Sequence, residues 1–244
     1  IPRKQENTLY LLLSGVVSVL QNAGAELIGG HTTEGPELGL GLSCNGLVSP
    51  TQIWRKGGMQ PGDQIILTKA LGTGTLFAAD MQLRAKGRWI DGAIASMLQS
   101  NQPAVACLGK HGATACTDVT GFGLAGHLLE MVTASKLNVT LNLDAIQVLP
   151  GAIASLEQGF FSSLYPENYK AETGIQGASK LQSHPSYPLL FDPQTSGGLL
   201  VTIPTAQAAA CLDELMALGY RDSRIIGQTL TQCEQPTIAL SADQ

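Results

Sequence analysis

The chain has 244 residues, of which 44% are hydrophobic and 14% are charged. A charged fraction this far below the typical ~25% allows a large buried core and excludes an intrinsically disordered chain. The net charge of −5 provides no basic surface, which argues against binding to nucleic acid. The five cysteines are widely spaced and form no C-x-x-C pair. We therefore predict reduced thiols in a cytoplasmic protein, with neither a disulfide framework nor a zinc site.

Residues 9–20 form the most apolar stretch, and these 12 residues are too few to cross a bilayer. Their leucines and valines recur at helical spacing, which predicts an amphipathic helix that ends at the Asn-Ala-Gly of residues 22–24. No membrane segment is expected in this chain. Because the sequence begins with Ile1, directly before this helix, we expect it to be a portion of a longer polypeptide.

Two short strands are predicted after this helix. Residues 25–30, AELIGG, are typical of a short buried strand. Residues 38–44 alternate leucine or cysteine with glycine or serine, which is the pattern of a strand with one buried face. Proline, glycine and charged residues then concentrate between residues 50 and 62, where we predict a domain boundary.

The second region alternates strands and helices, which is typical of an α/β fold. Residues 64–83 and 113–135 each predict a strand, a glycine turn and a helix, and the second helix has Leu124, Leu128 and Met131 on one face. We expect a further strand in 137–146, a short helix in 151–161, and a strand followed by a helix in 197–220. Residues 162–190 show no firm periodicity and predict a long loop that contains a little helix.

The segment GGHTTEGPE, residues 29–37, is the first candidate for ligand binding. Gly29 and Gly30 can turn backbone N–H groups toward an anion, and Thr32 and Thr33 add hydroxyl groups. The spacing alone favours the alternative, an ordinary turn capped by a threonine. His31 fits a turn residue as well as a ligand.

A second candidate is LGTGTL, residues 71–76, whose N–H groups could hold a phosphate at a helix start. It matches neither the Walker pattern nor the complete dinucleotide-binding pattern. The pattern favours Thr73 as a helix cap after a tight turn. A third candidate, DPQTSGG at residues 192–198, could form an anion-binding nest, but its composition favours a turn that enters a buried strand.

Asp118 is the most informative acid in the chain. It ends a strand-like run and precedes Gly121 and Gly123 at a helix start. Ligands gather at the carboxyl ends of strands in α/β sheets, and a carboxylate there suits Mg²⁺, which prefers oxygen ligands. The alternative is that Asp118 caps the helix through its side chain. The residues alone leave these two interpretations open.

Three segments in this order and spacing, GGHT at 29–32, TDVTGFGLAGHLLEM at 117–131 and DPQTSGGLL at 192–200, closely resemble the selenophosphate synthetase (selenide, water dikinase) family. The resemblance covers essentially the whole chain. It implies the two-domain α/β fold of the AIR-synthase-like superfamily of ATP-binding dimers. Residues 1–50 would then be the remainder of the amino-terminal ATP-binding and dimerisation domain, and residues 51–244 the carboxyl-terminal domain.

The resemblance also implies an activity and site residues. The family uses ATP and Mg²⁺ to convert selenide and water into selenophosphate, AMP and phosphate. Asp118 matches the family's metal-coordinating aspartate, and Gly30, His31 and Thr32 match its nucleotide-contacting loop. We identify no catalytic residue in this chain, since no Ser/His/Asp or Cys/His motif is present. One carboxylate is only part of a magnesium site. A homodimer in the cytoplasm is expected.

The sequence also departs from the family pattern. The family's reactive cysteine or selenocysteine, its lysine and two further metal-binding aspartates lie upstream of the matched region, and no counterpart of them is found here. We therefore expect this chain alone to fold and self-associate but not to catalyse. Two alternatives remain open: another AIR-synthase-like enzyme, such as an aminoimidazole ribonucleotide synthetase or thiamine-monophosphate kinase, and a non-catalytic nucleotide-binding or regulatory module of the same fold.

Overall fold

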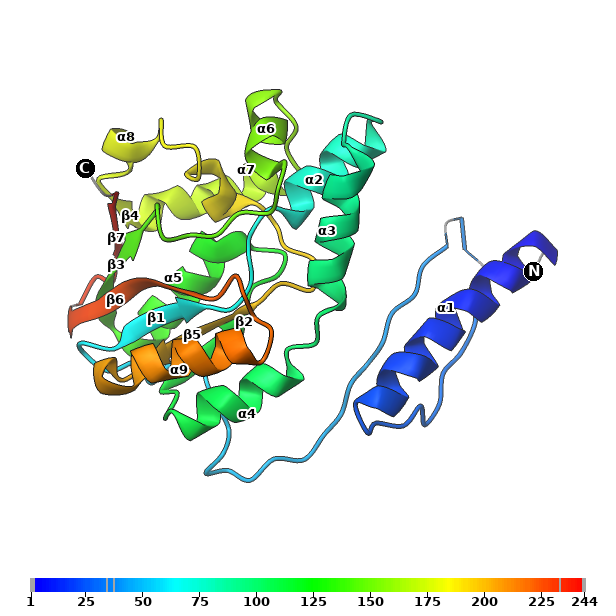
Figure 1. Cartoon of the computed structure of the whole chain (residues 1–244), viewed down its shortest axis with the longest axis horizontal. Helices are drawn as coiled ribbons and strands as arrows, with labels where there is room; N and C mark the ends of the chain where they lie inside the picture. The colour runs from blue at the N-terminus through cyan, green and yellow to red at the C-terminus, as the bar shows by residue number, and fades with distance from the viewer. Residues whose placement is uncertain (1–2, 34, 37, 233, 243–244) are drawn as a thin grey trace. The chain divides into compact units, whose positions relative to one another are not determined.

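The computed structural model describes residues 3–33, 35–36, 38–232 and 234–242, and the chain forms two compact units, Ile1–Ile53 and Trp54–Gln244. The first unit contains helix α1, Arg3–Asn22, which confirms the predicted amphipathic helix (Figure 1). The helix ends at Asn22, within the expected stop at residues 22–24, and Gly24 has a φ of +66°, a conformation that side-chain-bearing residues rarely adopt. In the described part of the chain, no helix is both long and apolar enough to cross a membrane.

The two strands predicted in the first unit are absent from its described residues. Residues 25–30 and the described stretch 38–44 have no strand pairing, and Leu38, Leu40 and Leu42 are 57%, 45% and 57% exposed. The prediction was therefore wrong for both segments. Alternation makes a segment suitable for a sheet, but a strand forms only when a neighbour accepts and donates its backbone hydrogen bonds. No described residue acts as such a neighbour here.

The second unit is built on one sheet of seven strands in the order β2-β5-β1-β6-β3-β7-β4 (Figure 1). The strands are β1 Gln64–Leu67, β2 Ala115–Asp118, β3 Leu137–Asn142, β4 Ile175–Gln176, β5 Leu199–Ile203, β6 Arg224–Gln232 and β7 Ile238–Ser241. The four pairings among β2, β5, β1, β6 and β3 are antiparallel, and β7 runs parallel to β3 and β4. The α/β class is confirmed, with a sheet that is mainly antiparallel.

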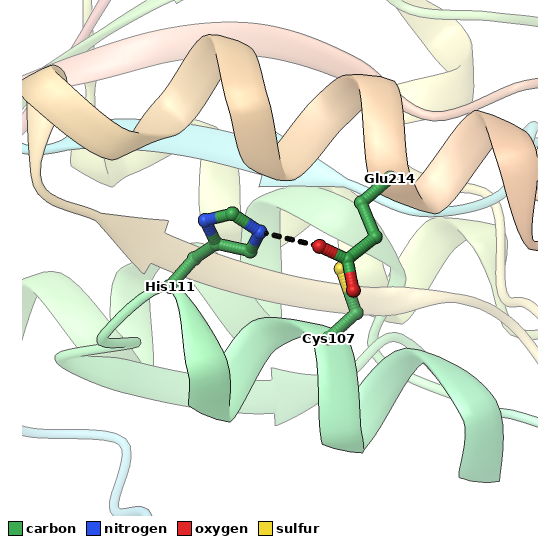
Figure 2. Close-up of side chains that lie close together, drawn as sticks. All are labelled: Cys107, His111 and Glu214. Atoms are coloured by element: carbon green, nitrogen blue, oxygen red, sulfur yellow. Dashed lines mark hydrogen bonds and ion pairs between the residues drawn. The ribbon is translucent and has the colours of Figure 1, made fainter.

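Helices cover both faces of this sheet. They are α2 Thr73–Met81, α3 Gly87–Leu98, α4 Gln102–Lys110, α5 Gly123–Ser135, α6 Ala152–Glu157 and α9 Thr205–Ala217. Ile65 packs with the residues of α2 and α5 on one face, whereas its neighbour Ile66 packs with those of α4 and α9 on the other. All five residues of β5, which lies between β2 and β1, are buried, because both of its faces are covered. Helices α4 and α9 lie against each other on the outer layer (Figures 1 and 2).

Most predicted elements of the second unit are confirmed. The strands β1, β2, β3 and β5 and the helices α2, α5, α6 and α9 all lie within the segments that their periodicity indicated. Four elements, α3, α4, β6 and β7, were not among the predictions. On α5 the expected residues Leu124, Leu128 and Met131 are all buried. Periodicity identifies such elements because one face of each packs on the core.

Residues 162–190, predicted to be a long loop with a little helix, contain several short helices and one short strand. These are α7 Tyr165–Asn168, the 3₁₀ helices η1 Tyr169–Gly174 and η2 Pro188–Phe191, strand β4 and α8 Ala178–Leu181. Aromatic rings hold these elements together: Tyr169 and Tyr187 both contact the buried ring of Phe191. Elements of two to six residues are too short to show a periodicity, so the sequence pattern could not reveal them.

Candidate functional site

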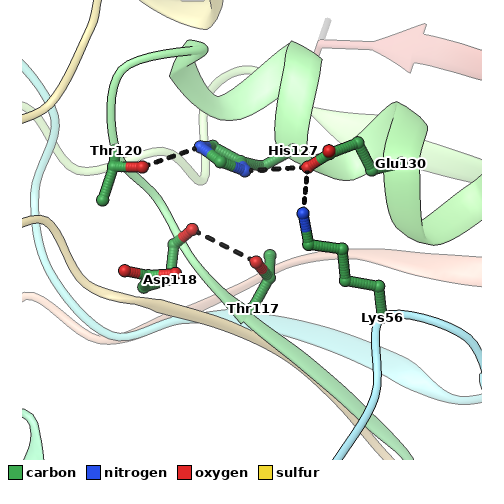
Figure 3. A network of polar contacts seen from close by, with 6 residues as sticks. All are labelled: Lys56, Thr117, Asp118, Thr120, His127 and Glu130. Carbon is green, nitrogen blue, oxygen red and sulfur yellow. Dashed lines mark hydrogen bonds and ion pairs between the residues drawn. The ribbon is translucent and has the colours of Figure 1, made fainter. Parts of the chain in front are cut away.

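Asp118 lies at the end of strand β2, where it pairs with Leu199 of β5. Alternation along the strand buries Ala115 and Thr117 and leaves the Asp118 side chain exposed. Within the described residues, its carboxylate has no hydrogen-bond or ion-pair partner, and it points away from the nearby Lys56–Glu130 pair (Figure 3). The carboxylate is therefore free to bind a cation from solution.

The helix-capping interpretation of Asp118 is wrong. Helix α5 begins at Gly123, its N-cap is Phe122, and no side chain forms a hydrogen bond to that N-terminus. The only hydrogen bond to Asp118 from a side chain among the described residues goes to its backbone carbonyl, from Thr117 Oγ1 at 3.3 Å (Figure 3). Neither carboxylate oxygen takes part in it. An exposed pair of hard oxygen donors at the end of a strand fits one ligand of a magnesium ion.

The two glycines after Asp118 serve different purposes. Gly123 has φ +70°, and a Cβ there would lie 2.9 Å from the Leu190 carbonyl oxygen. This glycine therefore permits the loop to press against the backbone of η2. A Cβ on Gly121 would meet no described atom within 4 Å, so packing within the described chain does not require a glycine there. The open side of Gly121 leaves room for a ligand to approach the loop.

The segment DPQTSGG, residues 192–198, packs directly on the loop that carries Asp118. Gln194 N donates to the Thr120 carbonyl oxygen at 2.9 Å, and Val119 N donates to the Gly198 carbonyl oxygen at 2.9 Å. A Cβ on Gly197 would collide with the Val119 carbonyl oxygen. The structure thus brings two of the three candidate segments of the second unit into contact.

The third segment, LGTGTL, joins them through one side chain. Gln194 Oε1 accepts hydrogen bonds from Gly72 N at 3.0 Å, Thr73 N at 3.2 Å and Thr73 Oγ1 at 3.2 Å. These donors would otherwise be available to a phosphate. The N-cap of α2 is Gly72, with φ 127°, so the prediction of Thr73 as the cap was wrong. The amide of Gln194 takes the place that an anion would occupy at this helix.

Asp192 is a buried structural acid. Its carboxylate accepts hydrogen bonds from Thr75 Oγ1 and Gln194 Nε2, both at 2.9 Å. Burial raises the pKa of Asp192 to about 6, and these hydrogen bonds oppose the increase. With an exposure of 0%, Asp192 is not available to a ligand in solution. Its position fixes the orientation of the Gln194 amide.

Lys69 is a second buried group that the sequence did not single out. Its Nζ donates to three backbone carbonyls, those of Ser96 at 3.0 Å, Gln99 at 2.7 Å and Ser196 at 2.9 Å. Burial lowers the pKa of Lys69 to about 8. Ser196 has a left-handed φ of 48°, and the Lys69 hydrogen bond helps to hold it there. No local pattern around Lys69 distinguishes it from a surface lysine.

A polar chain runs from the Asp118 loop along α5. His127 Nδ1 donates to Glu130 Oε2 at 3.1 Å, and Nε2 hydrogen-bonds with Thr120 Oγ1 at 3.1 Å (Figure 3). Glu130 Oε2 also pairs with Lys56 Nζ at 2.6 Å. His127 is 4% exposed, so it is a polar residue of the core. Burial raises the pKa of Glu130, but hydrogen bonds and charges from Lys56 and His127 lower it overall. These polar contacts connect the Asp118 loop to helix α5 and to Lys56.

Gly30, His31 and Thr32 belong to the other compact unit, Ile1–Ile53. Each of the three is exposed, and a Cβ on Gly30 would meet no described atom within 4 Å. The loop thus presents an open backbone to solvent. Its role in binding a nucleotide stays a prediction.

The fold and this arrangement define a class of protein. Residues 60–235 match the family model described as AIR synthase related protein, C-terminal domain. Among solved structures, hydrogenase maturation protein HypE aligns with a TM-score of 0.54 at 20% identity, covering 80% of this chain and 54% of that one. At this identity the likeness shows the fold alone.

Curated relatives narrow the class. The selenide, water dikinase of Trichlorobacter lovleyi is 36% identical over 236 residues, which cover 97% of this chain and 68% of that protein. The selenide, water dikinase of Bdellovibrio bacteriovorus is 34% identical over 232 residues, which cover 93% and 65%. The chain thus spans about two thirds of the length of these relatives. It belongs to the selenide, water dikinase family.

Proposed function

We propose that this chain takes part in the ATP-dependent formation of selenophosphate from selenide and water, with release of AMP and phosphate. The observation that carries this proposal is the 36% identity to a selenide, water dikinase over 97% of the chain. A solved HypE structure of the same fold contains ATP in its complex. The Asp118 loop adds support, because its exposed carboxylate is an oxygen donor of the kind that binds Mg²⁺ together with nucleotide phosphates.

In this proposal Asp118 provides one ligand of a Mg²⁺ ion, which supplies charge neutralisation at the ATP phosphates. The residues behind Asp118 keep the loop in place: Gln194 binds Thr120, and Gly123 allows close packing on η2. Gly30, His31 and Thr32 would contact the nucleotide through backbone N–H and side-chain groups. We also infer a homodimer located in the cytoplasm, on the basis of the family resemblance.

The test uses the complete gene product that contains these residues, in two variants. Asp118→Asn removes the proposed ligand, whereas Asp222→Asn removes an exposed carboxylate on a loop after α9. Loss of a metal ligand costs several kcal/mol of phosphate stabilisation, so Asp118→Asn should lower the rate of AMP formation at least ~100-fold. Asp222→Asn should retain the wild-type rate.

The assay follows AMP by chromatography and selenophosphate by phosphorus NMR, under anaerobic conditions with ATP, Mg²⁺ and selenide. Raising the Mg²⁺ concentration should partly restore the activity of the Asp118→Asn variant, because a weakened site fills at higher metal concentration. Equal rates for both variants would disprove the metal role of Asp118. A wild-type protein that consumes ATP only with a substrate other than selenide would overturn the proposed reaction.

A further inference from the structure

The outer helices α4 and α9 bring together three side chains that the proposed reaction does not use. Cys107 lies on α4, His111 follows one turn later as the C-cap of that helix, and Glu214 faces them from α9 (Figure 2). The sulfur, a ring nitrogen and a carboxylate oxygen of these residues all lie within 4.8 Å of one another. The spacing of the cysteines along the sequence predicted no zinc site. It could not reveal this cluster, because the three side chains come from segments far apart in the sequence.

Each ring nitrogen of His111 has a side-chain neighbour. Nε2 lies 2.9 Å from Glu214 Oε2, and Nδ1 lies 3.4 Å from Gln207 Oε1. Without a metal, Nε2–H can donate to the carboxylate, and the Gln207 amide can present its NH2 group to Nδ1. A Zn²⁺ ion would replace the Nε2 proton and take Nε2 and the carboxylate as ligands. Histidines that bind metals commonly donate their other N–H to a carbonyl oxygen, as Nδ1 can donate to Gln207.

We propose that Cys107, His111 and Glu214 form a binding site for Zn²⁺ between α4 and α9. A thiolate and an imidazole are the donors that Zn²⁺ prefers, and they exclude Mg²⁺ as the matching ion. In a tetrahedral zinc site the donor atoms lie roughly 3.2–3.8 Å apart. Atoms up to 4.8 Å apart would have to approach one another through side-chain rotations to reach this geometry, with one coordination position left for water.

The surroundings suit a site that binds metal reversibly. Cys107 and His111 are 2% and 7% exposed, whereas Glu214 is partly exposed and gives the ion a route from solvent. Lys110 Nζ pairs with Glu214 Oε2 at 2.7 Å, and its exposed chain can turn away when a metal binds. A thiol binds Zn²⁺ as the thiolate, so metal binding releases a proton.

A bound zinc ion would join two helices that share the core on one face of the sheet. Ile66 and Val201 of the sheet pack against this helix pair. Because only the folded chain holds the three ligands together, zinc should raise the midpoint of thermal unfolding. This effect is independent of nucleotide or selenide binding, so the zinc site and the proposed reaction can fail separately.

The experiment uses the full 244-residue chain, reduced and stripped of metal. Calorimetric titration with Zn²⁺ should show one site per chain, and Co²⁺ should give a thiolate-to-cobalt charge-transfer band with the intense visible bands of a tetrahedral ion. Cys107→Ser should abolish the charge-transfer band, and Glu214→Gln should lower the affinity for zinc at least ~10-fold. Gln207→Ala removes the partner of His111 Nδ1 and should lower the affinity for zinc about 10-fold.

Two matched controls separate this site from other thiols and imidazoles. Cys44→Ser changes an exposed cysteine, and His184→Asn changes a histidine paired with Asp144. Both should keep the zinc stoichiometry and the cobalt spectrum. Because Glu214 lies at the surface, Glu214→Gln remains informative if Cys107→Ser does not fold. The proposal is overturned if reduced wild-type protein binds no zinc, or if Glu214→Gln binds it as tightly as the wild type does.

Discussion

Gln194 closes the amino-terminus of helix α2 at Thr73, a residue 121 positions away in the chain. One amide oxygen satisfies the backbone N–H groups of Gly72 and Thr73 and the Thr73 hydroxyl. The backbone N–H of Thr195 returns a hydrogen bond to Thr73 Oγ1 at 2.9 Å. These contacts give a structural reason for the segment DPQTSGG: it joins the LGTGTL turn to the loop that carries Asp118.

Replacement of Gln194 by alanine should destabilise the second unit. The change leaves two buried N–H groups and a hydroxyl without their acceptor, so we expect a loss of about 2–4 kcal/mol in the free energy of unfolding. Urea denaturation followed by circular dichroism measures it. Gln158→Ala removes an exposed glutamine that bonds only to its own helix and should change stability by less than ~0.5 kcal/mol. Equal effects of the two variants would contradict the role of Gln194.

Lys69→Met should also be strongly destabilising. Methionine keeps the length of the side chain but leaves the carbonyls of Ser96, Gln99 and Ser196 without their shared donor. The expected cost is about 3–5 kcal/mol, and it should increase proteolysis at the ends of α3. Lys180→Met, at an exposed position, is the control. A Lys69→Met protein as stable as this control would show that water replaces the ammonium without loss.

Asp192 should make the stability depend on pH between about 4 and 6. Burial raises its pKa in the folded state to about 6 from 3.8, so the folded chain holds this proton more tightly than the unfolded chain does. Its contribution is therefore largest below pH ~4 and is lost as the pH rises through the folded pKa, by on the order of 3 kcal/mol.

The measurement is the unfolding free energy of wild type minus that of Asp192→Asn, followed from pH 4 to pH 7. This difference should decrease with increasing pH. A difference that increases over the same range would mean that the carboxylate is stabilised as an anion, and that its hydrogen bonds to Thr75 and Gln194 outweigh burial.

Gly123 and Gly121 provide a matched pair in the loop after Asp118. Gly123→Ala places a methyl group against the Leu190 carbonyl at a positive φ, so it should cost about 2–4 kcal/mol. Gly121→Ala meets open space and should cost less than ~1 kcal/mol. In the complete gene product Gly121→Ala should instead weaken nucleotide binding. Similar stabilities for the two variants would contradict the assigned packing.

Gly30→Val should weaken nucleotide binding in the complete gene product without changing its fold. A branched side chain blocks close approach of a ligand to the backbone, whereas no described atom lies within 4 Å of the new Cβ. Titration with a fluorescent ATP analogue measures the affinity, and Gly39→Val, at another open position, is the control. Unchanged affinity in a folded Gly30→Val protein would leave residues 29–33 as an ordinary turn.

The sequence by itself identified the elements whose pattern is local. Helix α5 was predictable because Leu124, Leu128 and Met131 recur at the helical period, and β2 because it precedes a glycine turn. The motifs around Asp118 and DPQTSGG also indicated the family, to which the chain belongs. Local patterns are readable because the hydrogen bonds of a helix and the alternation of a strand involve residues close together in sequence.

The tertiary structure decided what depends on distant partners. Residues 38–44 alternate like a strand, yet no described neighbour pairs with them, and the aperiodic residues 162–190 fold into short elements around Phe191. It also placed Gln194 on Thr73 and Glu214 beside Cys107. Such contacts join residues more than 100 positions apart, and their geometry is set by how helices and sheet pack, which no local periodicity encodes.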